Sequence, residues 1–240
     1  MESKNIVFLI VLIAAFGVFG YTARKILGYL KLAKPENRFD HFDKRIGNVL
    51  AIAFGQTKIL RDPVQRPIHF AIFWGFVILL LAVLESIGEG LIPGFSFAFL
   101  GPVYPVIAAA TDLVAAAVLI AVLFALFRRH VSGPKRLREL DTPSQMDATV
   151  ILITIALIMI SMFVQNATRI ALGDGADFAA NARFISAAMA GWFGSGSGTH
   201  LIFEIAWWVH IVLVLAFLNF LPYSKHFHVI TSIPNVYFSN

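Results

Sequence analysis

Three histidines, His69, His210 and His228, lie within or close to long apolar segments of the chain. Ionisable side chains are costly in such segments and therefore mark candidate functional sites. His210 and His228 are 18 residues apart, which is about five helical turns, so a continuous helix would present both from one face. Pro222 lies between them and favours a kink. Imidazole pairs from facing helices commonly hold a b-type haem, so haem ligation competes with the simpler interpretation of polar residues at a membrane surface.

Acidic residues lie toward the other ends of the apolar segments. Asp112, Glu85 and Glu204 could exchange protons with a quinone, which takes up or releases protons when its redox state changes. Arg169 lies near the end of another apolar segment and could form an ion pair with one of these carboxylates instead. A quinone or proton site and a purely structural role, as an ion pair or a water contact, both remain open for these four residues.

The composition indicates that these residues belong to a membrane protein. Of the 240 residues, 58% are hydrophobic and 14% are charged, and the mean hydropathy is +0.79. A soluble domain is about 45–50% apolar and about 25% charged, so a soluble enzyme, a disordered chain and a fibrous chain are excluded. We predict one all-α domain over residues 1–240, an integral membrane bundle of five transmembrane helices. The expected spans cover residues 6–32, 67–85, 103–127, 148–171 and 203–222.

The distribution of charge predicts how the bundle is oriented. Of the 19 lysines and arginines, only Lys4, Arg169 and Arg183 fall on one side of the predicted spans. Since basic residues accumulate on the cytoplasmic side of membranes, we expect the N-terminus outside and the C-terminus in the cytoplasm. The protein is then a multi-pass protein of the cytoplasmic (inner) membrane, in contact with the lipid bilayer. The net charge of +5 reflects this bias, and no nucleic-acid partner is predicted.

The chain contains no cysteine. This excludes disulfides, cysteine nucleophiles, thiolate zinc sites and any Fe–S cluster that the chain itself would hold. The histidines therefore remain as the main candidate metal ligands.

Two segments resemble a known family. Trp207-Trp208-Val209-His210 is followed by Leu221-Pro222-Tyr223-Ser224-Lys225-His226-Phe227-His228, and Arg66-Pro67-Ile68-His69 precedes Phe73-Trp74-Gly75-Phe76. These motifs resemble the fifth and second spans of the gamma subunit of respiratory nitrate reductase, a five-span cytochrome b. The resemblance extends over all five predicted spans, but its specific motifs lie in these two.

A closer resemblance is to the cytochrome b membrane domain of Fe–S oxidoreductases of the heterodisulfide-reductase-like and electron-transfer-flavoprotein:quinone types. Gly55-Gln56-Thr57-Lys58 and Ser224-Lys225-His226 carry it. The resemblance implies a quinone substrate, menaquinone or ubiquinone, and a cytoplasmic Fe–S protein or domain, with electron-transfer flavoprotein as a further partner. Because this chain lacks cysteine, the Fe–S clusters would belong to a partner or to a region missing from the sequence.

The resemblance also implies roles for individual residues. His69 and His228 match the ligand pair of a haem b near the cytoplasmic face, and His210 matches one ligand of a second haem near the outer face. Leu79 stands where the second ligand of that outer haem would be, so we expect one haem, with a second haem or a His69–His210 pair as alternatives. His226 is expected to face solvent.

Three basic residues, Arg66, Lys58 and Lys225, could meet the haem propionates, although the positive-inside bias is the simpler and favoured explanation of each. The expected function is electron transfer between the quinone pool and a cytoplasmic Fe–S or flavoprotein partner. Such a protein would be the membrane component of a quinone-linked oxidoreductase of a respiratory chain. The rival interpretation is a non-redox membrane anchor or a small transporter, which would not need these histidines.

Overall fold

The computed structural model describes residues 3–32, 34, 36–57, 65–132, 142–173 and 180–239. All regular secondary structure in this part of the chain is helical. Five helices are long and apolar enough to cross a membrane, as the sequence predicted. They are α1 (Ser3–Leu30), α3 (Gln65–Leu91), α4 (Val103–His130), α6 (Thr142–Leu172) and α8 (Ser197–Phe220).

Several of these helices extend beyond the predicted apolar spans. The predicted second span ends at residue 85, whereas α3 continues to Leu91. This additional length contains Glu89, whose carboxylate forms an ion pair with Arg169 of α6. Polar residues at a helix end carry no hydropathy signal, but they remain helical where another helix supplies a partner. The extension places Glu85 and Glu89 one turn apart on the same helix.

The short elements lie at the ends of the long helices. They are α2 (Phe42–Asn48), the π-helical turn η1 (Val49–Phe54), η2 (Phe97–Leu100), η3 (Ala180–Ala182), α7 (Phe184–Ala190), η4 (Leu221–Tyr223), η5 (Lys225–Phe227) and α9 (His228–Tyr237).

The helix that carries His210 does not continue to His228. After α8, Pro222 lies in the tight turn η4, and Ser224 has an extended backbone with φ −108° and ψ 166°. The Ser224 hydroxyl accepts a hydrogen bond from the backbone N–H of His226, which starts a new turn, and His228 is the first residue of α9. His210 and His228 therefore do not lie on one face of a continuous helix, because Pro222 ends the helix and does not only bend it.

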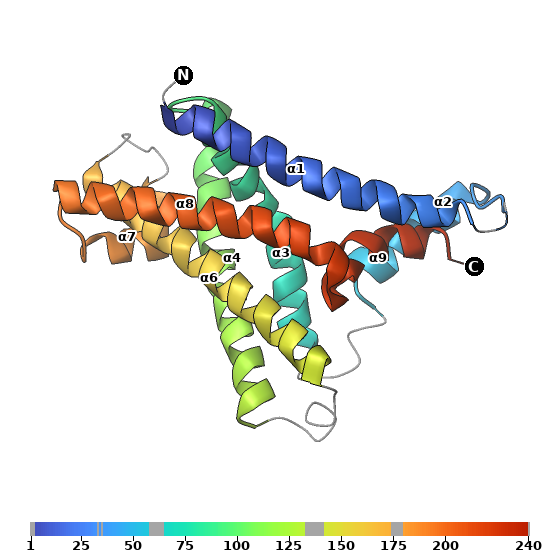
Figure 1. Cartoon of the computed structure of the whole chain (residues 1–240). Coiled ribbons are helices and arrows are strands. Elements are labelled where there is room, and N and C mark those ends of the chain that lie inside the picture. The colour runs from blue at the N-terminus through green and yellow to red at the C-terminus, as the bar shows by residue number, and fades with distance from the viewer. Residues whose placement is uncertain are drawn as a thin grey trace.

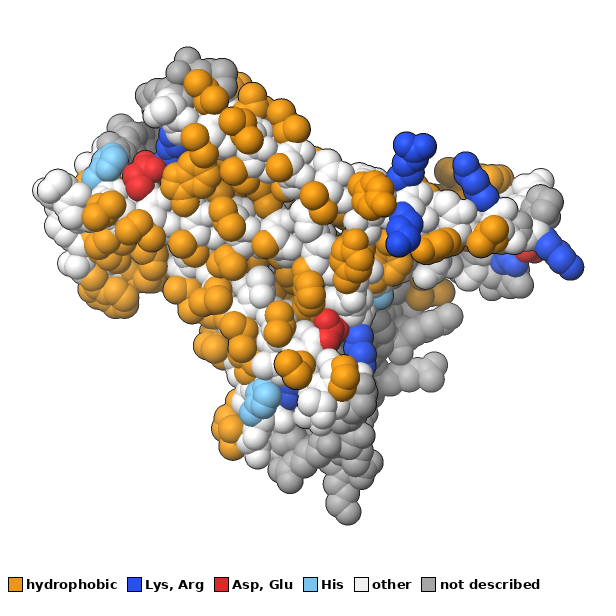
Figure 2. All heavy atoms as spheres, in the orientation of Figure 1, with side chains coloured by type: hydrophobic (Ala, Val, Ile, Leu, Met, Phe, Trp, Pro, Cys, Tyr) orange, Lys and Arg blue, Asp and Glu red, His pale blue; other side chains and the backbone are white. Residues whose placement is uncertain are grey.

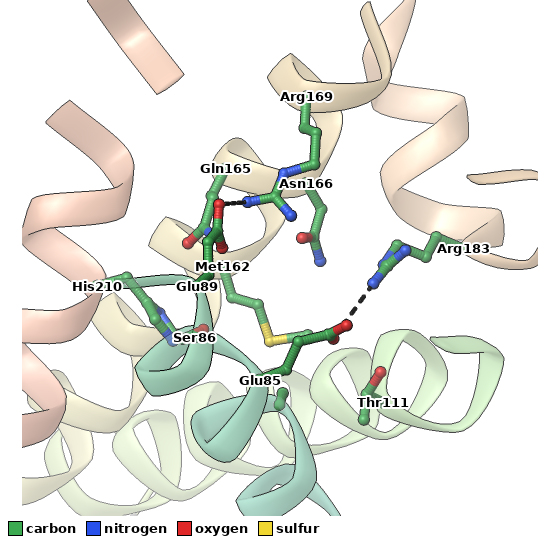
Figure 3. A pocket seen from close by; sticks show the side chains of 11 residues that line it. Glu85, Ser86, Glu89, Thr111, Met162, Gln165, Asn166, Arg169, Arg183 and His210 are labelled. Atoms are coloured by element: carbon green, nitrogen blue, oxygen red, sulfur yellow. Dashed lines mark hydrogen bonds and ion pairs between the residues drawn. The ribbon is translucent and has the colours of Figure 1, made fainter. Parts of the chain in front are cut away.

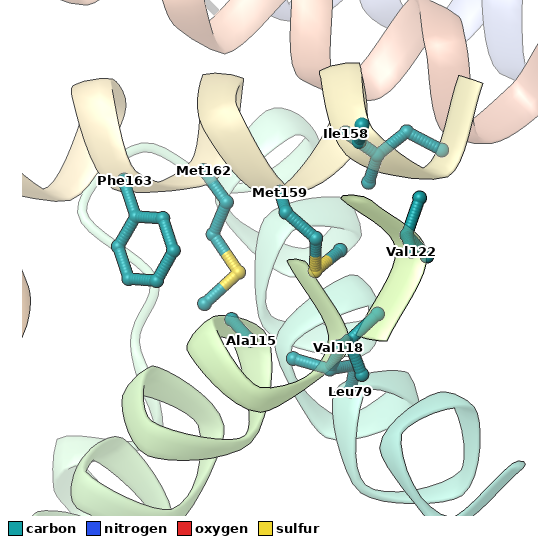
Figure 4. Close-up of a cluster of buried hydrophobic side chains, with 9 residues drawn as sticks. Leu79, Ala115, Val118, Val122, Ile158, Met159, Met162 and Phe163 are labelled. Carbon is teal, nitrogen blue, oxygen red and sulfur yellow. The ribbon is translucent and has the colours of Figure 1, made fainter. Parts of the chain in front are cut away.

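The long helices converge at one end of the molecule and diverge toward the other (Figure 1). They gather where α1 begins, whereas α1 and α8 run away from α4 toward the opposite end. Apolar side chains of α3, α4 and α6 form the largest buried cluster (Figure 4). Its buried members are Leu79, Ala115, Val118, Val122, Ala156, Ile158, Met159, Met162 and Phe163.

The outer surface of the bundle is apolar (Figure 2). In the most apolar stretch of each long helix, at most 39% of the residues are buried, and in α1 and α3 only 11% are. Side chains such as Ile10, Ile13 and Ile120 are more than 60% exposed. A surface of this kind is unfavourable in water and matches the hydrocarbon region of a bilayer.

Helix α1 lies at the edge of the bundle and is fixed at both ends. Near its start, the Asn5 amide donates to the carbonyl of Gly90 over 2.9 Å. Phe8 is fully buried, with its ring centroid 5.4 Å from that of Trp207 in α8. Near its end, the Thr22 hydroxyl lies 2.9 Å from the Tyr223 hydroxyl. These contacts connect α1 to α3 and to α8.

Gly75 allows α3 and α4 to pack closely, and this gives a test of the packing. A Cβ atom at Gly75 would lie 2.2 Å from Cγ2 of Val118. We expect Gly75→Ala to lower the free energy of unfolding by about 1–3 kcal/mol through overpacking, measured as a lower melting temperature in detergent. Gly17→Ala in α1 is the matched control, because nothing lies within 4 Å of its Cβ position. Equal melting temperatures for the two variants would contradict the α3–α4 contact.

Candidate functional site

His69 and the segment before α3 form one side of the inner site. His69 lies one turn into α3 and is half-buried. Its Nδ1 lies 3.1 Å from Oε1 of Gln56. Since an amide oxygen only accepts hydrogen bonds, Nδ1 carries the proton, and Nε2 keeps a free lone pair. This arrangement is the usual one for a histidine that binds a metal through Nε2.

Gln56 reaches His69 because the chain turns sharply after η1. Gly55 lies close to the helix, since a Cβ atom there would be 2.6 Å from the carbonyl oxygen of Ala51. Gln56 then adopts the left-handed conformation, with φ 52°, which is uncommon for a residue other than glycine and marks functional segments. Its side chain is buried, and its Nε2 has no hydrogen-bond partner among the described residues.

His228, which follows α8, is also oriented by a hydrogen-bond acceptor near its Nδ1. Its Nδ1 lies 3.0 Å from the carbonyl oxygen of Lys225, so Nδ1–H donates and Nε2 is again free. The ring of His226 is 5.5 Å from that of His228, centroid to centroid. Burial, reinforced by His228 and His69 and opposed by Asp147, lowers the pKa of His226 to about 4. The structure therefore brings the imidazoles of His69, His226 and His228 close enough to interact.

The prediction that His226 faces solvent is wrong. Its side chain is half-buried, and its Nδ1 is enclosed without a hydrogen-bond partner in the described part of the chain. The reason is the break after α8, which places residues 225–227 in a tight turn against the bundle instead of on a helix surface.

The nitrogen donors of this site can be compared with the number of ligands that a metal ion and a haem need. The described residues contain no group of three or more His, Cys, Asp or Glu side chains that could hold a metal ion, whereas a haem needs only two axial ligands. His69 and His228 each offer a free Nε2. Two nearby polar atoms, Gln56 Nε2 and His226 Nδ1, are buried and unpaired, as expected where a bound group would complete the site.

The basic residues predicted near the propionates differ in how well they are placed. Lys58 lies outside the described residues. Arg66 is exposed at the start of α3, near His69 in the sequence. The Lys225 side chain is exposed, while its backbone N–H donates to Asp147 Oδ2 over 2.9 Å. Arg66 and Lys225 therefore flank the two candidate ligands.

His210 is in a different environment from His69 and His228. It is only 3% exposed, and its Nδ1 lies 3.1 Å from the carbonyl oxygen of Ile158 and 3.2 Å from the Ser161 hydroxyl. Leu79, in the position of the missing second ligand, packs in the apolar cluster with Val118 and Met159. His210 is the one histidine among the residues that line the cavity it faces.

That cavity lies between α3, α6 and α8, toward the end where the helices converge (Figure 3). Its volume is ≈ 30 Å³. Glu89 pairs with Arg169, and Glu85 lies 3.8 Å from Arg183, which precedes α7. The lining residues are Ala82, Glu85, Ser86, Glu89, Thr111, Met162, Gln165, Asn166, Arg169, Arg183 and His210.

The other two predicted acidic residues lie elsewhere. Asp112 is fully buried and accepts hydrogen bonds from the Ile185 N–H over 2.7 Å and from the Ser186 hydroxyl over 2.5 Å. It therefore fixes the start of α7. Glu204 pairs with Lys4 over 2.8 Å and connects α8 to α1. Of the four predicted residues, only Glu85 and Arg169 line the cavity.

The sequence reasoning missed several residues of the cavity, although a signal for them exists. On α3, Glu85, Ser86 and Glu89 form a polar stripe, and on α6, Gln165, Asn166 and Arg169 form another at the same spacing. Residues at i, i+1 and i+4 share a face of a helix, so each stripe points in one direction. Comparing the two stripes would have marked Glu89, Gln165 and Asn166 as candidate site residues, although not which residue pairs with which.

Comparison with known proteins shows similarity along almost the whole chain. Over 238 residues, 99% of the chain, it is 32% identical to a "Probable iron-sulfur-binding oxidoreductase FadF" of Bacillus subtilis (strain 168). It is also 29% identical to an "EtfAB:quinone oxidoreductase" of Syntrophomonas wolfei, and this match covers 95% of the chain. The chain is a homologue of these oxidoreductases. It covers 33% of each of them, so it spans about a third of their length.

No family model and no solved structure matches the chain. The two relatives agree with the expected resemblance to Fe–S oxidoreductases of the electron-transfer-flavoprotein:quinone type. The resemblance to the nitrate reductase gamma subunit stays a prediction.

Asp112 provides a test of how the cavity is closed by α7. In Asp112→Ala the buried donors of Ile185 and Ser186 lose their acceptor, which we expect to cost about 1–3 kcal/mol for each unpaired donor. Arg183, which is 6% exposed in the native fold, should then become accessible, so trypsin should cleave after it faster than in the native protein. Leu113→Ala is the control, since Leu113 is 50% exposed. Unchanged cleavage in Asp112→Ala would exclude this role.

Proposed function

We propose that this chain is a haem b membrane protein that transfers electrons between the membrane quinone pool and a soluble redox partner. Its homologues are oxidoreductases whose names refer to iron–sulfur binding, to quinone and to EtfAB, the electron-transfer flavoprotein. The chain contains no cysteine, so any Fe–S cluster would be held by another protein or by a region outside this sequence. The partner is therefore an Fe–S protein or domain, or a flavoprotein, on the cytoplasmic side.

One observation carries this proposal: His69 and His228, from two distant segments, both direct Nδ1–H to a fixed acceptor. The acceptors are the Gln56 side chain and the Lys225 carbonyl. Each imidazole is thereby held in one tautomer and one orientation, which leaves Nε2 to bind the iron. The pairing of these two histidines is the one that the family resemblance implied.

A haem bound between these imidazoles would accept and donate single electrons. The side chains of this protein contribute ligation, orientation and charge. Gln56 orients His69, and the turn at residues 225–227 orients His228. Arg66 and Lys225 offer positive charge for the haem propionates.

The distribution of basic side chains supports a proposed membrane topology. Many basic side chains gather where α1 ends and α2 begins (Figure 2), at the end of the bundle where α9 lies (Figure 1). The positive-inside rule assigns this end to the cytoplasm and the N-terminus to the outside of the inner membrane. The quinone, menaquinone or ubiquinone, would react from within the bilayer. Glu85 and Arg169 then lie toward the outer face, where protons could be exchanged.

The haem content of the purified protein tests the proposal directly. We expect about one b-type haem per chain in a reduced-minus-oxidised spectrum, and its loss in His69→Ala and in His228→Ala, because one axial ligand alone holds the iron weakly. His200→Ala is the control, since His200 is exposed on the opposite side of the bundle. His210→Ala should keep the full signal, whereas a fall to about half would reveal a second haem. Protein without haem would favour a membrane anchor or a small transporter.

Gln56 gives a finer test of the same site. In Gln56→Ala the His69 imidazole loses its acceptor, so it becomes a weaker electron donor, and the affinity for haem should fall by about 10- to 100-fold. The midpoint potential of the remaining haem should rise for the same reason. Leu50→Ala, at a 60% exposed position of η1, is the control. A purely structural Gln56 would lower stability and leave the potential unchanged.

A further inference from the structure

Two long helices present matching faces to the cavity. The lining residues of α3 and those of α6 each follow the spacing i, i+3, i+4 and i+7, which is one helix face over two turns. These residues are Ala82, Glu85, Ser86 and Glu89 on α3, and Met162, Gln165, Asn166 and Arg169 on α6. Both faces are most polar at the ends of the helices and become apolar deeper in the bundle.

The charges of the cavity balance one another. Two carboxylates, Glu85 and Glu89, face two guanidinium groups, Arg169 and Arg183. Arg183 also donates to the Tyr104 hydroxyl of α4 over 3.2 Å. Glu85 additionally accepts the Phe97 N–H over 2.8 Å. Asp112, the other acidic group nearby, is engaged by α7. Charged groups within apolar helices are costly, and they usually mark an ion path, a proton path or a water-filled space.

His210 lies at the deep end of this polar region. It is 13 residues from the start of α8, which is roughly 20 Å along the helix. Its side chain is 3% exposed and lines the cavity next to Ser86 (Figure 3). His210 therefore marks the deep limit of the cavity.

We propose that this cavity is a water-filled half-channel through which protons pass between the outer face and the carboxylates of Glu85 and Glu89. Its volume of ≈ 30 Å³ holds about two water molecules, and its lining offers the polar partners that buried water needs. It is too small for a quinone ring. Each transfer moves one proton between water and a carboxylate of Glu85 or Glu89, and changes no other bond. The proposal rests on the proposed function only for the assignment of this end to the outer face.

The absence of native cysteine permits a direct test with single-cysteine variants. Ser86→Cys, Asn166→Cys and His210→Cys place a thiol at increasing depth in the cavity. Leu84→Cys, at a 56% exposed position of the apolar surface, and Ala167→Cys, at a fully buried position of α6, are matched controls of similar depth. Ag⁺ is added outside sealed vesicles, and the thiols left unreacted are then labelled with a fluorescent maleimide after denaturation.

We expect Ag⁺ to block the three cavity thiols at least about tenfold faster than the control thiols, because a thiol ionises and reacts only where water reaches it. The rate for Ser86→Cys should rise about tenfold when the outer pH increases from about 6 to about 7, since the thiolate fraction of a group with a pKa near 8.5 grows by that factor. Raising only the inner pH should leave the rate unchanged.

Equal rates at cavity and control positions, or a rate that follows the inner pH, would overturn the half-channel. Gly198→Cys, at an exposed position at the start of α8, reports orientation independently through a membrane-impermeant maleimide. If Gly198→Cys is labelled from outside while Ser86→Cys stays unreacted, the half-channel fails and the proposed topology stands. If Gly198→Cys is labelled only from inside, the proposed topology fails. His210→Cys protein that is monodisperse in gel filtration excludes misfolding as the cause of any change.

Discussion

The cost of placing charged side chains among apolar helices determines how this bundle is assembled. Several charged groups pair between elements: Glu89 of α3 pairs with Arg169 of α6, and Lys4 of α1 pairs with Glu204 of α8. Asp112 of α4 holds the start of α7. These contacts all lie at the end where the helices converge. Since apolar side chains pack equally well in several registers, the charged pairs fix which helices meet and at what height.

The other end of the bundle is organised by hydrogen bonds to backbone carbonyls. Arg45 donates to the carbonyl oxygens of Tyr237 and Ser239, and Arg38 donates to that of Phe238. The guanidinium groups thus satisfy the free carbonyls at the end of α9, as basic residues commonly do at helix C-termini. The segment containing His228 is thereby held against α2 and η1, beside the segment that carries Gln56. The inner site depends on these contacts, because His69 and His228 belong to separate helices, α3 and α9.

The sequence predicted the five helices well, because about twenty consecutive apolar residues carry a strong and local signal. The pairing of His69 and His228 as haem ligands stays a prediction, although the two imidazoles influence each other electrostatically in the structure. The sequence did not predict that α8 ends at Pro222, because proline allows either a kink or a break, and only the contacts of Ser224 and Asp147 decide between them. The roles of Glu89 and Arg183 were also missed. Their partners lie 80 and 98 positions away, and pairing at that distance depends on tertiary packing alone.

The charge balance of the cavity has an evolutionary consequence. Removing one member of a buried ion pair leaves an unpaired charge and typically costs about 3–5 kcal/mol, whereas replacing both members with apolar residues is often neutral. Glu89 and Arg169, and likewise Glu85 and Arg183, are therefore expected to change together among related sequences. Covariation between these positions would record the α3–α6 contact and the position of the loop before α7, even in relatives whose structures are unknown.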